Sequence, residues 1–202
     1  MPSSVLILVA AGAIVAISVV TGVAIAIKKR SFSVLSLVRS GLVAGLYVTI
    51  CLVLQPLSFG AVQIRAAEAL VLLPVFGPEY IIGVTLGCFI ANAIASVPID
   101  ALVGTFATMI AGLATYLLRR CRVKRLAVVP ALPPVIFNAV IVGLEISFLF
   151  GNSAATLPAV LLNMVTVGLG EILSCMVLGV ALVRFIEKNR LLRTMFTDEK
   201  GE

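Results

Sequence analysis

Long runs of apolar residues, separated by short polar or basic segments, limit this chain's fold more than any other feature. A helix needs about 20 apolar residues to cross a bilayer, and several runs approach or exceed that length. The composition agrees, because 61% of the 202 residues are hydrophobic and only 12% are charged. Soluble domains are roughly half apolar and a quarter charged. We therefore predict an all-α integral membrane protein.

The basic residues indicate how the helices are oriented. Short loops rich in Lys and Arg mark the cytoplasmic side of a membrane protein. Fourteen of the fifteen basic residues fall within 28–39, 119–125 and 184–200, and Arg65 lies apart from them. We interpret the clusters as orientation signals that also contact membrane lipid, and not as a nucleic-acid patch, despite the net charge of +6.

The apolar runs predict an extra N-terminal span followed by a six-span core. The extra span is Val5–Ile27, although Ala24-Ile25-Ala26 also resembles a signal-peptide cleavage site. A linker at Ser31–Val38 is expected to lead into the core. Six crossings that start in the cytoplasm place all three basic clusters there, as the positive-inside rule requires. The expected core spans are 40–57, 64–75, 80–97, 99–118, 133–150 and 157–185.

We divide the chain accordingly into three parts. Residues 1–31 hold the extra span and a basic linker, and residues 32–193 form the six-span core. Residues 194–202 form a cytoplasmic tail.

Polar side chains inside the apolar runs gather toward the predicted outer side, and they include Asp100 at the start of the fourth span. Such residues are costly beside lipid, so they usually face a cavity, a partner or a ligand. Asn138 and Glu145 are seven residues apart and share a helix face. An outward-facing pocket is therefore expected, although polar contacts between helices are the alternative. The candidate substrate-binding residues are Gln63, Arg65, Glu68, Asn92, Asn138, Glu145, Asn163 and Glu171.

Small residues recur at four-residue spacing in two spans, a pattern that lets helices approach closely. We expect Gly83 and Gly87 to pack within the bundle. In the first core span, contact with an external partner helix competes with internal packing. The candidate partner-interface residues there are Ser40, Gly41, Ala44 and Gly45.

Motifs for catalysis, ATP binding and metal binding are missing from the sequence. It holds no histidine and no CxxC pair, so neither a metal site nor a metal cofactor is expected. There is no GxxxxGK[ST] loop, so the chain is not expected to drive transport with ATP by itself. We do not expect an enzyme, and we interpret all four cysteines as structural: Cys51, Cys88, Cys121 and Cys175.

Four ordered segments carry a family resemblance: SFGAVQIRAAEAL, GPEYIIGVTLGCFIAN, LPPVIFNAVIVGLE and the GLGE of the sixth span. They resemble the QueT family, and the resemblance covers about residues 33–190. These proteins are substrate-binding S components of energy-coupling factor (ECF) transporters, thought to import queuosine precursors. The resemblance implies a six-helix bundle in the bacterial plasma membrane with both core termini in the cytoplasm. The extra span Val5–Ile27 departs from that plan.

The resemblance also implies a transport mechanism and its partners. An S component captures its substrate outside, docks on a membrane scaffold subunit that carries two cytoplasmic ATPases, and topples to release its cargo inward. The family's small-residue motif contacts the scaffold. Either Ser40 with Ala44 or Gly41 with Gly45 matches it, and Ala44 is the favoured residue.

The implied cargo suits the candidate pocket. A 7-deazaguanine presents adjacent N–H donors, which Glu145 or Glu171 can accept bidentately. Asn138 and Asn163 can meet the remaining groups, and an aminomethyl substituent would favour a second carboxylate such as Glu68. The residues that could cover the ring are Phe59, Phe137 and Phe148.

Three other functions remain open at this point. The chain could be an S component for a different vitamin-like solute. It could instead be a solitary secondary transporter that uses Glu145 and Glu171, although no repeat or unwound-helix pattern supports this. A membrane assembly protein without a ligand would leave the outer carboxylates unexplained.

Overall fold

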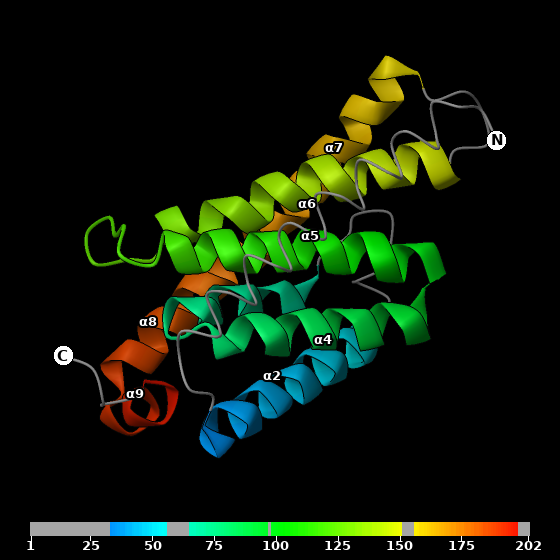
Figure 1. Cartoon of the computed structure of the whole chain (residues 1–202). Coiled ribbons are helices and arrows are strands. Elements are labelled where there is room, and N and C mark those ends of the chain that lie inside the picture. Colours follow the sequence, from blue (N-terminus) through cyan, green and yellow to red (C-terminus); the bar gives the residue numbers. More distant parts are fainter. Residues whose placement is uncertain (1–32, 56–64, 97, 151–155, 198–202) are drawn as a thin grey trace.

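The computed structural model of the protein describes residues 33–55, 65–96, 98–150 and 156–197. The described part is an all-α bundle, in which α2, α4, α5, α6 and α7 follow one another as packed neighbours (Figure 1). Three predicted features lie outside the described residues: the extra span Val5–Ile27, the site residue Gln63 and the possible ring cover Phe59.

Helix α2, Val34–Val53, begins earlier than the sequence predicted. Its N-cap is Ser33, whose hydroxyl accepts a hydrogen bond from the Ser36 N–H at 3.2 Å, so the helix has a capped start. The predicted linker Ser31–Val38 is therefore wrong from Val34 onward. The predicted span began only after Arg39, because we took this basic residue to mark the cytoplasmic boundary of the membrane. Arg39 lies inside the helix, 8% exposed, with its guanidinium 3.8 Å from the Glu79 carboxylate.

Helix α4, Glu79–Ala95, packs closely against α2. A Cβ added to Gly83 would lie 2.7 Å from the Ser40 backbone oxygen, and one added to Gly87 would lie 2.7 Å from the Tyr47 Cβ. The prediction that these glycines pack within the bundle is confirmed. The Ser40 hydroxyl also donates to the Glu79 carbonyl at 2.8 Å, which ties the two helices together near their starts.

Segment η1, Ala66–Val75, is a ten-residue 3₁₀ helix at the centre of the bundle. Every residue from Ala67 to Val75 is buried, and η1 contacts α2, α4, α5 and η4. A 3₁₀ helix rises about 2.0 Å per residue, so ten residues reach about 20 Å where an α-helix would reach about 15 Å. This geometry lets the short second segment extend through much of the bundle.

The rest of the bundle forms from two long stretches and one single helix. The single helix is α5, Pro98–Leu117. The first stretch runs from η2, Val129–Ala131, through α6, Leu132–Glu145, to the π-helical η3, Ile146–Phe150. The second comprises α7, Leu157–Glu171, the π-helical η4, Ile172–Gly179, and α8, Val180–Lys188.

Among the residues that the structure describes, four helical stretches are long and apolar enough to cross a membrane. Two shorter apolar helices, Ala66–Val75 and Glu79–Ala95, lie among them. Together these six stretches match the order of the six predicted core spans. The four long ones are Val34–Val53, Ile99–Leu117, Val129–Phe148 and Leu157–Lys188.

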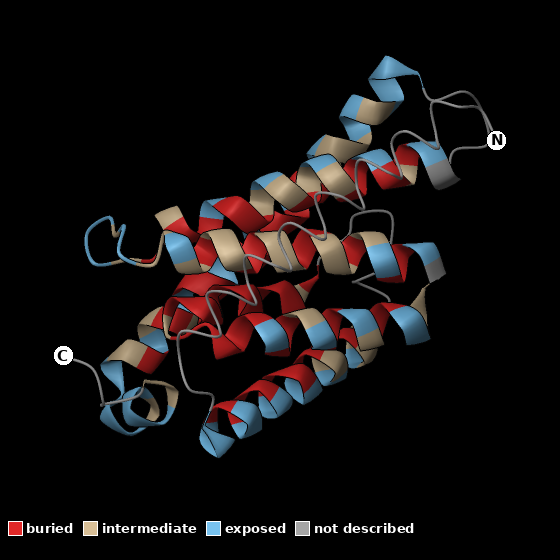
Figure 2. Ribbon diagram, in the orientation of Figure 1, coloured by how far each residue is buried: buried red, intermediate tan, exposed pale blue. Residues whose placement is uncertain are grey.

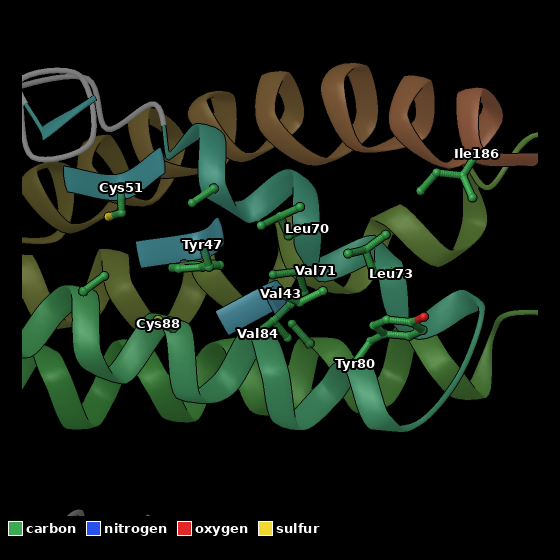
Figure 3. Packing of buried hydrophobic residues seen from close by; sticks show 13 residues of the cluster. Val43, Tyr47, Cys51, Leu70, Val71, Leu73, Tyr80, Val84, Cys88 and Ile186 are labelled. Carbon is green, nitrogen blue, oxygen red and sulfur yellow. The ribbon is translucent and has the colours of Figure 1, made fainter. Parts of the chain in front are cut away.

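Apolar side chains occupy both the inside of the bundle and its outer surface. Buried residues line the faces where helices meet, whereas the outward faces are exposed (Figure 2). These outward faces are still apolar, and Leu37 and Leu42 of α2 are examples. This pattern suits a surrounding hydrocarbon layer. The main apolar core joins α2, η1 and α4, with Tyr47, Val71 and Val84 among its labelled members (Figure 3).

One end of the bundle carries the Arg-rich segments 119–125 and 184–193, and we call it the basic end. There Arg122 forms an ion pair with Glu187 at 3.1 Å. Helix α9, Arg190–Phe196, lies at the same end, and the Tyr80 hydroxyl donates to the Phe196 carbonyl at 3.0 Å. The expected boundary at residue 193 therefore falls inside a helix that is joined to the core.

We expect Gly83→Leu to destabilise the purified protein, because any side chain there meets the Ser40 backbone. Overpacking typically costs about 1–3 kcal/mol. Gly41→Leu is the matched control, since a Cβ on Gly41 meets nothing within 4 Å. Thermal unfolding of both variants in detergent measures the difference. Equal midpoints would contradict the close packing of α2 on α4.

Candidate functional site

Buried polar side chains meet in the interior of the bundle. They come from α2, α4, α5, α6, the η1 segment with the residue before it, and the junction of α7 with η4, and none is more than 6% exposed. Their concentration inside an apolar bundle is the main departure from a purely structural core. This polar cluster consists of Tyr47, Arg65, Glu68, Cys88, Asn92, Asp100, Thr108, Asn138, Glu145, Glu171 and Cys175.

Part of the cluster surrounds Arg65, the residue just before η1. The Arg65 guanidinium lies 3.6 Å from the Asp100 carboxylate, and the Asn92 amide donates to the Asp100 carbonyl at 3.5 Å. Glu145, the last residue of α6, is close enough to interact electrostatically with both Asp100 and Arg65. We call Arg65, Asn92, Asp100 and Glu145 the Arg65 layer.

A Cβ at Gly104 would lie 2.8 Å from the Asn92 amide nitrogen. A side chain at that position of α5 would therefore displace the Asn92 amide. A larger residue there would push Asn92 away from Asp100.

The rest of the cluster surrounds Glu68. One Glu68 oxygen, Oε1, accepts hydrogen bonds from the Tyr47 hydroxyl at 2.5 Å and the Thr108 hydroxyl at 3.3 Å. The Cys175 thiol donates to Glu171 Oε2 at 3.3 Å and to the Glu68 carbonyl at 3.4 Å. We call Tyr47, Glu68, Thr108, Asn138, Glu171 and Cys175 the Glu68 layer.

Several atoms of the cluster make no well-aligned hydrogen bond within the described part of the chain, although Asn138 lies beside Glu68 and Glu171, and Glu145 beside Asp100. These are both carboxylate oxygens of Glu145, both polar atoms of the Asn138 amide, and Glu68 Oε2. Buried polar groups are nearly always hydrogen-bonded, since leaving one unpaired costs about 1–3 kcal/mol. A set of such atoms in one place indicates a site prepared for a ligand or for water.

Three of the carboxylates sit on unusual backbone. Glu68 lies in the long 3₁₀ helix η1, although 3₁₀ runs beyond about four residues are uncommon. Glu145 and Glu171 are each the last residue of an α-helix that continues as a π-helix. Such π segments are frequent at functional sites. The backbone thus departs from the α form at three of the positions that carry charge.

Six of the eight candidate substrate-binding residues meet in this cluster: Arg65, Glu68, Asn92, Asn138, Glu145 and Glu171. Asn163 is not among the buried members of the cluster; its half-buried amide donates to the Ser147 hydroxyl at 2.9 Å. Arg65 forms an ion pair with Asp100 and also interacts electrostatically with Glu68, whose Oε1 accepts a hydrogen bond from Tyr47. Of the possible ring covers, Phe148 is 68% exposed and faces away from the interior.

Sequence reasoning did not select Tyr47, Cys88, Thr108 or Cys175 for the site. Each belongs to a residue type that is common in membrane helices, so only contacts within the cluster reveal their place. Tyr47 and Thr108 donate to Glu68, Cys175 donates to Glu171, and Cys88 accepts from Thr108. Cys88 and Cys175 were interpreted as structural, yet they accept and donate hydrogen bonds inside the cluster. Cys175 stands four residues after Glu171, a helical spacing that could have suggested the contact.

The small residues of α2 divide between two faces. Ser40 and Ala44 are each 5% exposed and pack against α4. Gly41 and Gly45 are exposed, and a Cβ on either meets nothing within 4 Å. Among the described residues, the open small-residue face is therefore the Gly41 and Gly45 face and not the Ala44 face.

An apolar groove of about 320 Å³ lies between α4 and α5. Its lining includes the exposed Leu86 and Phe89, and its polar side chains are Thr85 and Thr105. No charged residue and no member of the polar cluster lines it. Hydrocarbon, and not a polar solute, is the chemistry that fits this groove.

The fold and the polar cluster together define a polytopic α-helical membrane protein that encloses a polar site, the arrangement of a small-molecule transporter. Comparison with known families agrees. Residues 37–188 match the model of the QueT transporter family, and the chain belongs to that family. The family resemblance predicted from the sequence is confirmed.

A curated relative is the queuosine precursor transporter QueT of Lactococcus lactis subsp. cremoris (strain MG1363). The chain is 32% identical to it over 85 residues, which cover 41% of this chain. The match spans about half of the relative, 48% of its length. No solved structure matches the chain.

Proposed function

We propose that this chain is the membrane-embedded substrate-capture (S) subunit of an ECF-type importer for a queuosine precursor with a 7-deazaguanine base. The observation that carries the proposal is the buried polar cluster, with unpartnered atoms on Asn138 and Glu145. The family match supports the transporter class, and the name of the Lactococcus relative supports the substrate. The transporter itself would carry no cofactor.

The position of the cluster supports capture from outside. Asp100 is near the start of α5, whose other end leads to the Arg-rich segment 119–125. Segments rich in Lys and Arg remain in the cytoplasm. The chain would thus lie in the bacterial plasma membrane with its core termini inside, and the Arg65 layer would face outward.

Recognition would use the atoms that the bundle leaves unpaired. The Glu145 carboxylate would accept two adjacent N–H donors of the base, as carboxylates do with forked donors. Asn138 offers both a donor and an acceptor, so it would meet a further ring edge or the carbonyl. Arg65, Glu68, Asn92 and Glu171 complete the proposed site, and Gln63 and Asn163 belong to it only as sequence-based candidates.

Energy would come from partners, since the sequence holds no ATP-binding loop. A membrane scaffold subunit with two cytoplasmic ATPases would receive the loaded subunit, which would then topple to release its cargo inward. The open face of Gly41 and Gly45 on α2 is the proposed scaffold contact, because small residues let a second helix approach closely.

We expect the purified chain to bind a 7-deazaguanine base, and Glu145→Gln and Asn138→Ala to weaken that binding. A hydrogen bond to a charged group contributes about 1.5–3 kcal/mol, so Glu145→Gln should cost roughly 10–100-fold in affinity. Calorimetry in detergent measures the effect. Glu187→Gln is the matched control, because Glu187 pairs with Arg122 at the basic end, away from the cluster.

Two results would replace the proposal with an alternative. If calorimetry detects binding of a different vitamin but no binding of 7-deazaguanine bases, the chain remains an S component and the proposed substrate is wrong. Uptake into vesicles by the chain alone, without scaffold or ATPases, would indicate a solitary secondary transporter that uses Glu145 and Glu171.

A further inference from the structure

The apolar groove between α4 and α5 has no part in the proposed function. Its wall on α4 includes Ile82, Leu86 and Phe89, whose spacing of four and three residues places them on one helix face. These side chains are 37%, 47% and 43% exposed, so the described part of the chain leaves this face open. The groove is thus an apolar helix face, about two turns long, without a protein partner among the described residues.

Two hydroxyl groups in the lining of this groove lack a hydrogen bond. The hydroxyl oxygens of Thr85 and Thr105 are buried, and neither has a partner among the described residues, the carbonyls of its own helix included. A buried hydroxyl that is left unpaired is costly. The groove therefore suits an occupant that is mainly apolar but carries hydrogen-bonding groups of its own.

We propose that the extra N-terminal span, Val5–Ile27, packs into this groove as an additional transmembrane helix against α4 and α5. The span is apolar apart from two hydroxyl side chains, Ser18 and Thr21. Ser and Thr side chains form hydrogen bonds between membrane helices, and each can both donate and accept. The acyl chain of a lipid, in contrast, has no group that could bond to Thr85 or Thr105.

The described chain begins at the same end of the bundle as α4. Ser33 is the N-cap of α2, and the Ser40 hydroxyl donates to the Glu79 carbonyl at the start of α4. Ser33 precedes Ser40 by about two helical turns, or about 10 Å. The chain from Ile27 to Ser33 extends up to about 20 Å, whereas neighbouring helix axes are about 8–10 Å apart. The linker is therefore long enough to bring the span from α2 to the groove.

The direction of the span places one of its hydroxyls level with the groove. With Lys28-Lys29-Arg30 in the cytoplasm, the span runs antiparallel to α4, and Ile27 is level with Glu79. Thr21 is six residues from Ile27, and Thr85 is six residues from Glu79. Both positions are thus about 9 Å from the same level, so Thr21 can bond to Thr85.

The face of the span that carries Thr21 also suits close packing. Ser18 lies one turn further toward the outer side, and Thr105 lies in the outer half of α5. Ser18 and Gly22 are small residues at four-residue spacing, a pattern that lets helices approach closely. The side of the span that offers hydroxyl groups is therefore also the side that can come nearest to α4 and α5.

The test is disulfide cross-linking of the full chain in isolated membranes. Ile25→Cys is combined with Ile82→Cys or with Leu86→Cys, two groove positions one turn apart, in a chain that also carries Cys121→Ser. Cysteines in contacting helices reach disulfide geometry, so we expect one of these pairs to oxidise within a single chain at least about tenfold faster than the control. The control combines Ile25→Cys with Val165→Cys, an exposed residue of α7, which packs against α6.

A second measurement leaves the cysteines and the hydroxyl groups unchanged. Gly22→Leu enlarges the face that we place against the groove, so we expect it to lower the midpoint of thermal unfolding by a few degrees. Gly12→Leu is the matched control, because Gly12 lies on the other side of the span and leucine there would face lipid. Equal midpoints for the two variants would contradict the packing of the span even if the cysteine variants do not fold.

Three cross-linking results would overturn the proposal. The first is oxidation of both groove pairs at the rate of the control. The second is a product of twice the chain's mass, which would place a second copy in the groove. The third is a purified chain whose mass lacks the residues before Ile27, because a signal peptidase would then have removed the span. None of these results bears on substrate binding, which calorimetry tests separately.

Discussion

Replacing Arg65 by glutamine is expected to cost the ligand-free protein about 3–5 kcal/mol of unfolding free energy. Arg65 is 4% exposed and its guanidinium lies 3.6 Å from the Asp100 carboxylate, which is itself buried. Removing one partner of a buried ion pair leaves the other charge without compensation, and that cost exceeds the value of the pair. Arg65→Gln should therefore lower the midpoint of thermal unfolding more than a surface substitution does.

The chain offers both a readout and a matched control for this prediction. Cys51, Cys88 and Cys175 are buried, so a thiol-reactive dye reports their exposure on unfolding, and Cys121→Ser removes the exposed thiol. Arg122→Gln breaks a more exposed ion pair, and exposed pairs contribute at most about 1 kcal/mol.

A second substitution tests the mechanism of the Arg65 effect. Asp100→Asn added to Arg65→Gln removes the stranded charge, so the double variant should regain part of the loss. If Arg65→Gln unfolds within about 1 kcal/mol of the wild type, the buried ion pair is not a stabilising element.

The sequence predicted the all-α membrane class and the order of the six core spans, because lipid requires long apolar helices. It did not predict the helix type of the second segment. The sequence of a ten-residue apolar run does not indicate whether it forms an α-helix or a 3₁₀ helix. The 3₁₀ form of this segment depends on its packing against α2, α4, α5 and η4. The early start of α2 was missed for a related reason, since Glu79, the partner of Arg39, lies 40 residues further along the chain.

The candidate site was partly predictable because charged residues are rare inside membrane helices. The free-energy cost of a charged side chain inside a membrane helix was enough to select Glu68, Glu145 and Glu171. All three lie in the cluster. The layering was not predictable, because it depends on contacts between distant segments, such as that of Tyr47 with Glu68. Asn163 was also selected by its helical position, and its side chain donates to the Ser147 hydroxyl, a contact that the sequence did not predict.

If the proposed scaffold subunit is the partner of this chain, Gly41→Leu is expected to abolish uptake while leaving ligand binding and stability intact. Gly41 lies on the exposed face of α2, where a Cβ meets nothing within 4 Å, so leucine fits the isolated subunit. A partner helix that approaches within the distance allowed by glycine could no longer do so. Co-purification with the scaffold subunit and uptake in cells that contain all subunits measure the loss. Calorimetry and thermal unfolding of the isolated Gly41→Leu chain test whether its ligand affinity and stability equal those of the wild type.

Two further substitutions decide which face of α2 meets the partner. Ala44→Leu acts on the inner face, where Ala44 is 5% exposed and its carbonyl lies 3.0 Å from the Cβ position of Gly87. We expect it to lower the stability of the isolated subunit, by overpacking, before any scaffold is added. Ala93→Leu enlarges an exposed residue of α4 and should affect neither stability nor uptake. If Gly41→Leu and Ala93→Leu both assemble and transport normally while Ala44→Leu is stable but unassembled, the Ser40 and Ala44 face is the scaffold contact. Such a result would require α2 to separate from α4 when the subunit docks.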